Sequence, residues 1–319
     1  MWPRWIALAA IPAALLAAGC GGGEDASGSS GNQQQLSGRI QADGSSTVGP
    51  FTTLAAERFQ TSSPGVRVTV GISGTGGGFE RFCAGETDLS DASRPIKDEE
   101  QAACEQNGVD HVEFQVANDA LTVVVSADND WVDCLTVEEL HEIWAPGSKV
   151  ASWSQVRDGF PDEPLELFGP GTDSGTFDYF TGEINGEEGA SRSDYTASED
   201  DNVLVRGVAG SKGGLGYFGF SYFEENAGRL RALGIDGGDG CVEPSVETAQ
   251  NGEYTPLSRP LFVYAKTASF EQPHVSAFVR FMLSHVEELA EGAKFVPLTD
   301  EQLAKAKSDY NAALKQVGA

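Results

Sequence analysis

The stretch GSSTVGP, residues 44–50, decides the fold class of this chain. It follows a short extended segment, 39–43, and it leads into residues 50–60, whose apolar side chains recur at helical spacing. Glycines let a backbone approach a ligand closely, and a helix start offers unpaired N–H groups and the positive end of a dipole. A strand, a Gly-rich loop with hydroxyls and a helix therefore predict an α/β unit with an anion site at the helix start.

Two further loops share this composition and this position between a strand and a helix. The first is SGTGGG, residues 73–78, and the second is GPGTDSGT, residues 169–176, which precedes Phe177, Phe180 and Ile184 at helical spacing. Helix capping explains any one of these loops, because Ser and Thr are preferred N-caps. Three together predict a site that surrounds a tetrahedral oxyanion without a large positive charge.

The rest of the chain alternates strand-like and helix-like segments, which indicates α/β architecture with largely parallel sheets. Strands are expected at 66–72, 121–125 and 261–264, and helices at 77–84, 278–289 and 300–316. The last helix opens with Thr299 and Gln302 in the positions of a capping box.

The charge balance excludes several classes of partner. Among 319 residues, 48 are acidic and 21 basic, which gives a formal charge of -27. A nucleic-acid partner is not expected, because phosphate backbones are bound by clustered Lys and Arg. A basic patch for anionic lipid is disfavoured for the same reason. Any anionic ligand must be held by local donors, and the length suggests two domains of ordinary size.

The N-terminus has the pattern of an export signal. Arg4 supplies a positive charge, and the apolar segment 6–18 is too short to span a bilayer as a helix. The sequence LAAGC, which ends at Cys20, resembles a bacterial lipobox. We expect a lipoprotein signal peptide at 1–19, lipid on Cys20 and a Gly/Ser-rich tether at 20–37. Plain secretion without the lipid is the alternative.

Four cysteines remain after Cys20, namely Cys83, Cys104, Cys134 and Cys241. An even number in an exported chain predicts two disulfides, for which three connectivities are possible. Pairs Cys83–Cys104 and Cys134–Cys241 are favoured because each then lies within one expected domain. A zinc site is the alternative, but no CxxC motif or nearby His supports it, and no metal is predicted.

Arg94 is a candidate anion ligand close to the second loop. It is the only guanidinium in DLSDASRPI, residues 88–96, and Pro95 restricts the backbone just after it. A single Arg can give bidentate, charge-assisted hydrogen bonds to an oxyanion. A surface pair with Asp88 or Asp91 is the alternative role.

These motifs resemble those of the periplasmic phosphate-binding protein of the high-affinity phosphate ABC importer, the PstS family. The resemblance runs from about residue 38 to the last helix and rests on GSSTV, SGTGGGF, DASRPI and GTDSGTFDYF, at 44–48, 73–79, 91–96 and 171–180, together with 191–205 and 214–219. It implies a type II periplasmic-binding-protein fold, in which two α/β lobes joined by two crossover strands close over the ligand in a cleft.

The resemblance also implies a division of the chain into lobes. Lobe I is expected to comprise 38–115 and 265–319, and lobe II is expected at 126–255. The crossover hinge strands are expected at 116–125 and 256–264.

Carried over from the family, the phosphate ligands fall on hydroxyls and backbone amides of the three loops. They are Ser46, Thr47 and Val48, then Ser73, Thr75 and Gly76, then Ser174, Gly175 and Thr176. Two positions depart from the family pattern. Pro170 stands where many members carry an Arg, and Ser93 stands where many carry a binding Asp. We therefore expect Ser93 and Arg94 to replace that pair.

A carboxylate in the site is expected to accept the proton of monohydrogen phosphate and to repel fully ionised sulfate. Asp91 and Asp173 are the candidates, with Asp43 weaker. Each also has a structural alternative, since Asp173 can cap a helix and Asp91 can orient Arg94.

The signal-like N-terminus predicts an extracytoplasmic lipoprotein, anchored to the cell membrane by its lipid. The resemblance implies that it binds inorganic phosphate and delivers it to an ABC import permease. It is expected to be a monomer without a cofactor and not an enzyme. A binding protein for sulfate or molybdate is one alternative. A phosphatase with a Ser nucleophile is a weaker one, because no general base can be identified.

Overall fold

The computed structural model describes residues 36–172 and 174–318. The predicted signal peptide at 1–19, Cys20 and most of the tether predicted for 20–37 lie outside the described residues, and so does Asp173. Among the described helices, none combines the length and the apolar character needed to cross a membrane.

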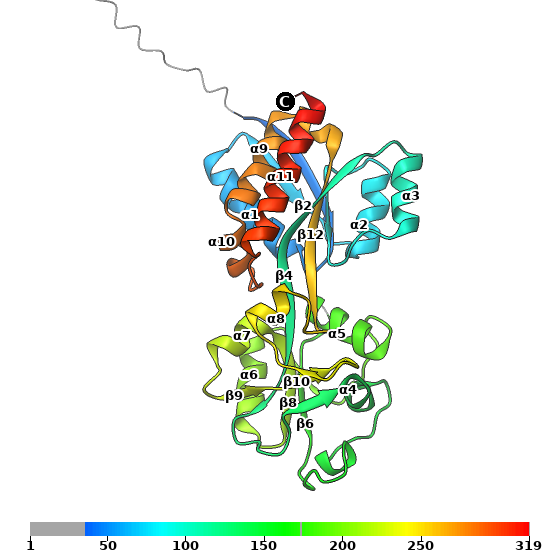
Figure 1. The fold of residues 1–319 in the computed structure, drawn as a ribbon, viewed down its shortest axis with the longest axis vertical. Helices are drawn as coiled ribbons and strands as arrows, with labels where there is room; N and C mark the ends of the chain where they lie inside the picture. The colour runs from blue at the N-terminus through cyan, green and yellow to red at the C-terminus, as the bar shows by residue number, and fades with distance from the viewer. Residues whose placement is uncertain (1–35, 173, 319) are drawn as a thin grey trace, which may run out of the picture. The chain divides into compact units, whose positions relative to one another are not determined.

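Lobe I, named here for the part that holds the first strands and the last helices, is a sheet covered by helices on both faces (Figure 1). Its strands are β1 (Gly38–Gly44), β2 (Val66–Val70) and β3 (Leu89–Ala92). Its helices are α1 (Gly49–Ser62), α2 (Gly74–Cys83), α3 (Asp98–Gln106), α9 (Pro273–Ser284), α10 (Val286–Gly292) and α11 (Asp300–Val317), with a 3-10 turn at Thr267–Glu271. One core lies between the sheet and α1, α9, α10 and α11, and a second lies under α2 and α3.

Lobe II is built in the same way around a second group of strands. These are β5 (Cys134–Thr136), β6 (Glu166–Gly169), β7 (Thr196–Ala197), β8 (Gly214–Gly219), β9 (Leu230–Ala232), β10 (Gly234–Asp236) and β11 (Cys241–Val242). Its helices are α4 (Val137–Trp144), α5 (Gly175–Asn185), α6 (Asp201–Gly210), α7 (Phe220–Glu225) and α8 (Val246–Gln250), with a 3-10 turn at Trp153–Gln155. Its main core combines Leu, Val and Ile side chains with aromatic rings that include Trp144, Trp153, Phe180 and Tyr217.

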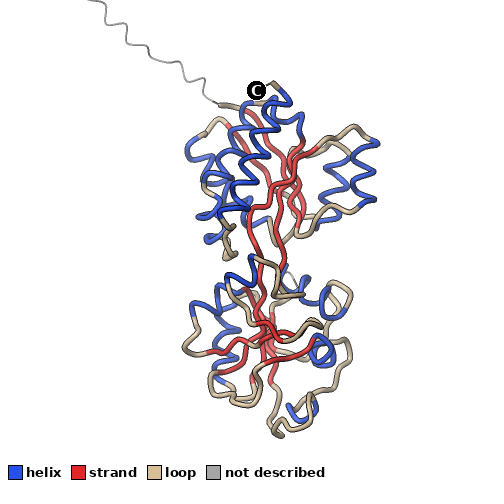
Figure 2. The backbone as a smooth tube through the Cα atoms, viewed as in Figure 1, coloured by secondary structure: helices blue, strands red, loops and turns tan. Residues whose placement is uncertain are grey.

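Two long strands belong to both lobes. β4 (His111–Ser126) and β12 (Ser258–Lys266) pair antiparallel, with Arg259 opposite Asp119, and run from one lobe to the other (Figure 2). Within the described residues the strand order is β2-β1-β3-β12-β4-β8-β6-β7, with β9 beside β4, and β11-β10-β5 form a separate sheet. The expected hinge segments 116–125 and 256–264 fall largely on these two strands, while the lobe boundaries themselves stay a prediction.

The expectation of largely parallel sheets is wrong for the sheet as a whole. β1 pairs parallel with β2 and β3, and β6 pairs parallel with β7 and β8. β12 and β4, however, are antiparallel to every neighbour, including β3 and β8. The sheet is therefore mixed, because the two strands that cross between lobes run in opposite directions through it.

Three element boundaries differ from the sequence prediction. α2 begins at Gly74, so that residues 74–78 of the second loop form its first turns. The helix expected at 278–289 is two helices, broken at His285, whose N–H bonds back to the carbonyls of Phe281 and Met282. The strand expected at 121–125 is only the end of β4, whose first half carries polar residues among the apolar ones.

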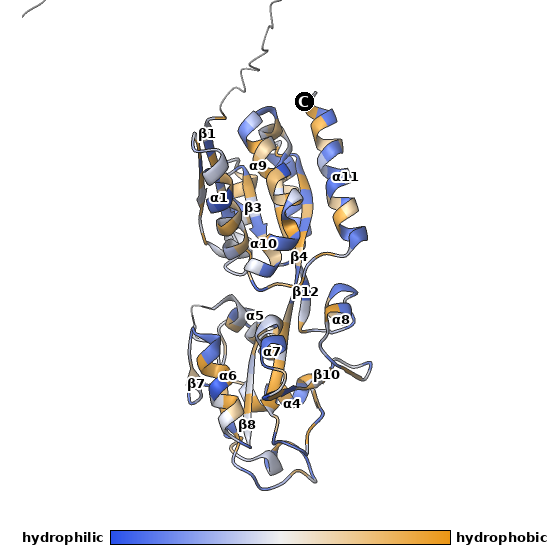
Figure 3. Cartoon of the chain, turned by 90° about the vertical axis from the view of Figure 1, so that its left-hand side faces the viewer, coloured by the Kyte–Doolittle hydropathy of each residue, from blue (hydrophilic) through white to orange (hydrophobic). Residues whose placement is uncertain are grey.

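The other helices agree with the sequence patterns. Thr299 and Gln302 form the predicted capping box, in which Thr299 Oγ1 accepts from the N–H of Gln302 at 3.1 Å. Figure 3 shows α11 with hydrophobic and hydrophilic residues alternating along its length, as expected for a helix that packs one face on a sheet. The predicted disulfides are both present, Cys83–Cys104 and Cys134–Cys241.

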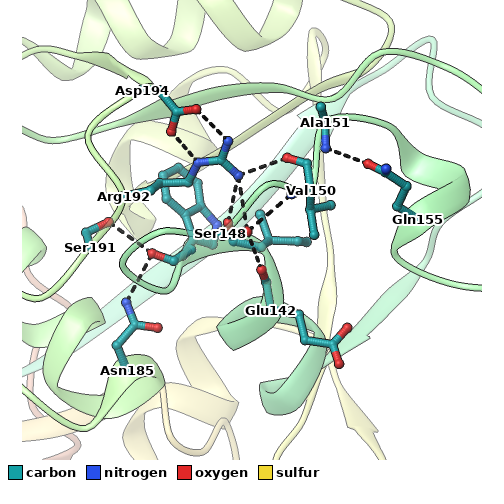
Figure 4. A network of polar contacts seen from close by, with 11 residues as sticks. Glu142, Ser148, Val150, Ala151, Gln155, Asn185, Ser191, Arg192 and Asp194 are labelled. Carbon is teal, nitrogen blue, oxygen red and sulfur yellow. Dashed lines mark hydrogen bonds and ion pairs between the residues drawn. The ribbon is translucent and has the colours of Figure 1, made fainter.

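A buried arginine, Arg192, hydrogen-bonds to several backbone carbonyls and to a carboxylate in lobe II (Figure 4). Arg192 Nη1 donates to the carbonyls of Ile143 and Val150 at 3.0 and 2.9 Å, and the other guanidinium nitrogens bind Asp194. The carbonyl of Trp144, the last residue of α4, accepts from the N–H of Arg192 at 3.1 Å. These donors satisfy carbonyl groups at the end of α4 that the helix itself leaves unpaired.

Candidate functional site

In the first loop, one hydroxyl binds the backbone of the loop itself, and two other hydroxyls line a cavity. Ser45 Oγ accepts from the N–H groups of Thr47 and Val48 at 3.2 and 3.4 Å, and the N–H of Ser45 donates to the carbonyl of Asp91. Ser45, which the sequence analysis did not select, thus shapes the loop. Ser46 and Thr47 instead line a cavity of about 190 Å³.

The second loop and the segment with Ser93 are joined through their hydroxyls. Thr75 Oγ1 lies 3.0 Å from Ser93 Oγ and accepts from the N–H of Ser93 at 3.2 Å. Ser73 Oγ instead donates to Asp43 at 2.7 Å, and Asp43 also binds Arg81. Thr75 and Ser93 therefore belong to one cluster, and Ser73 is held by a buried carboxylate.

The third loop caps α5, as its composition predicts. Ser174 Oγ accepts from the N–H of Thr176 at 3.2 Å, and the carbonyl of Ser174 accepts from the N–H of Asp178. The backbone of Gly175 lies against the first loop: a Cβ placed on Gly175 would be 2.6 Å from Thr47 Oγ1 and 3.2 Å from Ser46 Oγ. The first and third loops are therefore in direct contact, although Thr47 and Gly175 are 128 residues apart in the sequence.

Seven of the eleven predicted ligands line two cavities, each of about 190 Å³, while Val48, Ser73, Gly76 and Ser174 line neither. One is lined by Ser46, Thr47, Gly175 and Thr176, and the other by Thr75, Ser93 and Arg94. Val48 is buried in the core of lobe I, and its backbone N–H donates to Ser45 Oγ, so it lines neither cavity. Gly76 lies in α2, where an added Cβ would be 3.9 Å from Arg94 Nη2.

Arg94 forms a fork-to-fork ion pair with Glu100 on α3. Its Nη1 and Nη2 donate to the two carboxylate oxygens at 2.8 and 2.7 Å. Burial opposes ionisation of Glu100, but the hydrogen bonds from Arg94 and from the N–H of Lys97 outweigh it and lower the pKa of Glu100. Arg94 pairs with neither Asp88 nor Asp91, so the structure replaces both partners considered from the sequence with Glu100.

Asp91 lies in the interior of lobe I and lines neither of these two cavities. Its Oδ1 accepts from Thr52 Oγ1 at 2.8 Å, while its Oδ2 has no hydrogen-bond partner among the described residues. Burial raises the pKa of Asp91 to about 7, against the hydrogen bond from Thr52, which lowers it. Its role as acceptor of the phosphate proton stays a prediction, and Asp173 lies outside the described residues.

An ion pair that no sequence motif indicated links the two cavities. Arg259 on β12 and Asp119 on β4 pair at 3.3 Å, with side chains 15% and 14% exposed. Arg259 lines the cavity of Arg94, and Asp119 lines the cavity of Thr47. The available signal was an Arg near the start of the strand SRPLFVYAK, whose central residues are apolar.

Carboxylates from lobe II face the same cavities. Asp178, Glu183 and Glu188 line the cavity that contains Arg94, and burial raises the pKa of Asp178 and of Glu183. Asp201 lines the other cavity, where burial and then the neighbouring Asp200 raise its pKa to about 6. The described residues include no cluster of His, Cys, Asp and Glu able to hold a metal ion.

The chain is similar to a known protein family and to several characterised proteins. Residues 26–286 match the family described as PBP superfamily domain. The chain is 47% identical over 280 residues to Protein SphX of Synechocystis sp., covering 87% of this chain and 83% of that protein. It is 38% identical over 301 residues to the phosphate-binding protein PstS of Staphylococcus saprophyticus, covering 94% of this chain and 91% of that protein.

A solved structure is similar over most of the chain. The crystal structure of a possible phosphate binding protein from Planctomyces limnophilus superposes with a TM-score of 0.85 at 51% identity. The alignment covers 88% of this chain and 99% of that one.

Proposed function

Because this chain belongs to the PBP superfamily domain family and to the PstS phosphate-binding proteins, with their type II periplasmic-binding-protein fold, we propose that it binds inorganic phosphate and delivers it to an ABC import permease. The protein acts by capture and release and performs no chemistry on its ligand. The curated PstS relative carries the name phosphate-binding protein, and the similar solved structure is described as a possible one.

The contact between Gly175 and Thr47 is the observation that carries this proposal. It brings two Gly-rich loops with hydroxyl groups together, one before α1 and one at the start of α5. Each helix start offers unpaired N–H groups, which bind anions without a net positive charge. A small oxyanion between the loops can therefore be bound by neutral donors although the whole chain is strongly acidic.

The proposed ligand set remains the one expected from the three loops. Ser46 and Thr47 come from the first loop, and Thr75, Ser93 and Arg94 from the second cluster. Ser174, Gly175 and Thr176 complete the set from lobe II. The domain boundaries and the hinge segments at 116–125 and 256–264 are part of the same proposal, since closure over phosphate requires a hinge between the lobes.

We further propose that the protein is monomeric, extracytoplasmic and attached to the membrane by lipid on Cys20. The lipobox-like LAAGC sequence and the polar segment after it support this localisation. Mass spectrometry of the N-terminal peptide from membrane-extracted protein tests it. A diacylated Cys20 is expected, and a mature N-terminus without lipid would mean plain secretion.

Calorimetric titration of the phosphate-depleted protein tests the ligand. We expect heat of binding with one phosphate per chain, and weaker or no binding of sulfate and molybdate. Tighter binding of sulfate or molybdate than of phosphate would contradict the proposal. Incubation with a chromogenic phosphate ester tests the phosphatase alternative, and steady release of the chromophore would overturn the assignment as a binding protein.

A further inference from the structure

The ion pair between Arg259 and Asp119 lies on the two strands that connect the lobes and is largely buried. The two residues are direct cross-strand neighbours on β12 and β4, the strands that run between the lobes. Both side chains are largely withdrawn from water, and Nε and Nη2 of Arg259 each lie 3.3 Å from Asp119 Oδ2. Desolvation of two charges offsets most of their mutual attraction, so a pair of this kind is weak evidence for a role in stability alone.

Arg259 touches both walls of the site as well as the hinge strands. Its Nη2 donates to Thr47 Oγ1 at 3.0 Å, and Thr47 belongs to the first loop of lobe I. The guanidinium carbon lies 3.6 Å from the ring centroid of Tyr179, which is on α5 of lobe II. Tyr179 is itself fixed, because its hydroxyl donates to the carbonyl of Pro256 at 2.5 Å.

The guanidinium still has donor capacity that faces the site. Its described hydrogen bonds use Nε and Nη2, and Nη1 makes none to any residue within 36–172 and 174–318. Arg259 lines the same cavity as Thr75, Ser93 and Arg94. In Arg94, by contrast, both terminal nitrogens donate to Glu100 and Nη1 also donates to the carbonyl of Pro95, so a smaller part of its donor capacity remains for a ligand.

We infer that Arg259 is a second guanidinium of the anion site, which donates to bound phosphate, and that Asp119 is the positioning residue that holds it. This inference rests on the proposed function and extends it to residues outside the three loops. Stacking on Tyr179 and pairing with Asp119 fix the plane of the guanidinium before the ligand arrives. A cation fixed in this way binds an oxyanion without the entropy loss of ordering a flexible side chain.

Phosphate titrations of Arg259→Gln and Arg259→Lys test the inference. Loss of a charge-assisted donor is expected to weaken phosphate binding by roughly 10- to 100-fold in Arg259→Gln. Arg259→Lys keeps the charge without the planar fork and should retain more affinity than the Gln variant. Phosphate affinity equal to that of wild type in both variants would overturn the inference.

Arg157→Gln is the matched control. Arg157 also pairs with a carboxylate, Glu139, and also lies over an aromatic ring, Phe160, but it lines neither cavity of the site. Phosphate binding by this variant should stay within about twofold of wild type, and a loss equal to that of Arg259→Gln would overturn the inference. Thermal unfolding without phosphate identifies any variant that fails to fold, and Arg259→Lys is the more conservative of the two.

The wild-type titration in the same series separates the two conclusions. If wild type binds phosphate and Arg259→Gln binds it equally well, the role of Arg259 is wrong and the proposed function stands. If wild type does not bind phosphate, the proposed function fails together with this inference.

Discussion

Gly175 at the start of α5 lies so close to Thr47 that a Cβ on Gly175 would be 2.6 Å from the Thr47 hydroxyl oxygen and 3.0 Å from its backbone nitrogen. A larger side chain at Gly175 requires the Thr47 hydroxyl to rotate away and the backbone of one loop to shift slightly. The contact joins a loop of lobe I to a loop of lobe II at the cavity lined by Ser46, Thr47 and Thr176.

Gly175→Ala is therefore expected to weaken phosphate binding by at least tenfold while leaving the fold intact. The added methyl group holds the two loops apart and so opposes the arrangement that surrounds the anion. Calorimetric titration measures the affinity. Gly210→Ala in α6 is the matched control, since an added Cβ there has no atom within 4 Å. Equal affinities of the two variants would contradict the proposed approach of the loops.

Arg94→Gln tests the cation that the sequence already indicated. Arg94 lines the cavity with Thr75 and Ser93 and is held by Glu100, so its loss should weaken phosphate binding roughly tenfold, because one charge-assisted donor is removed. The control is Arg58→Gln, which breaks an exposed pair with Glu288 on another face of lobe I. Unchanged phosphate affinity in Arg94→Gln would mean that Arg94 only pairs with Glu100 on α3 and does not contact phosphate.

The buried carboxyl of Asp91 predicts a pH dependence of stability. Burial raises its pKa from 3.8 to about 7, so between these values the unfolded chain releases a proton that the folded chain keeps. The folded state then binds more protons, and stability falls as pH rises through this window, by at most about 1.4 kcal/mol per pH unit. Above about pH 7 the folded state also ionises, and this fall ends.

Asp91→Asn removes that contribution because an amide does not ionise and can still accept from Thr52. Urea unfolding at pH 5, 6 and 7 should show a shallower decline in the variant than in wild type. Asp98→Asn, in the first turn of α3, reports the general effect of removing one carboxylate. Parallel pH profiles of wild type and Asp91→Asn would rule out a raised pKa at Asp91.

The sequence predicted the local features of the site better than its assembly. The capping of α5 by Ser174 and of α11 by Thr299 follows from side-chain chemistry within three residues, so it could be read directly. The pairing of Arg94 with Glu100 was missed although they are six residues apart, because the turn into α3 that brings them together has no clear sequence signal. The pairing of Arg259 with Asp119 depends on strand register across 140 residues, which one sequence does not encode locally.

The contrast between local sequence signals and contacts of distant residues also explains why the start of α2 was predicted incorrectly. A helix was expected only from residue 77, with Gly74 and Gly76 in the loop before it, yet both lie within α2 although glycine is the poorest helix former after proline. A Cβ on Gly78 would be 2.5 Å from the Cα of Gly44, so the close packing of α2 on β1 requires glycine at this position. Tertiary packing therefore outweighs helix propensity in this segment.

Arg192 should matter for stability and not for phosphate binding. Its guanidinium is 6% exposed and donates to the carbonyls of Ile143 and Val150, which Arg192→Leu leaves without these donors. Unpaired buried polar groups cost about 1–3 kcal/mol each, so we expect a loss of roughly 2–4 kcal/mol in the free energy of unfolding. Urea denaturation measures this loss.

Asp194→Asn separates the two halves of this network. Asp194 is 62% exposed, and ion pairs with exposed partners contribute little, so its loss should cost below about 1 kcal/mol. A much larger loss in Arg192→Leu than in Asp194→Asn would mean that the carbonyls of Ile143 and Val150, and not the ion pair, are the groups that require Arg192. Equal losses would assign the stabilisation to the ion pair instead. Phosphate affinity should be unchanged in both variants, because neither residue lines the cavities of the site.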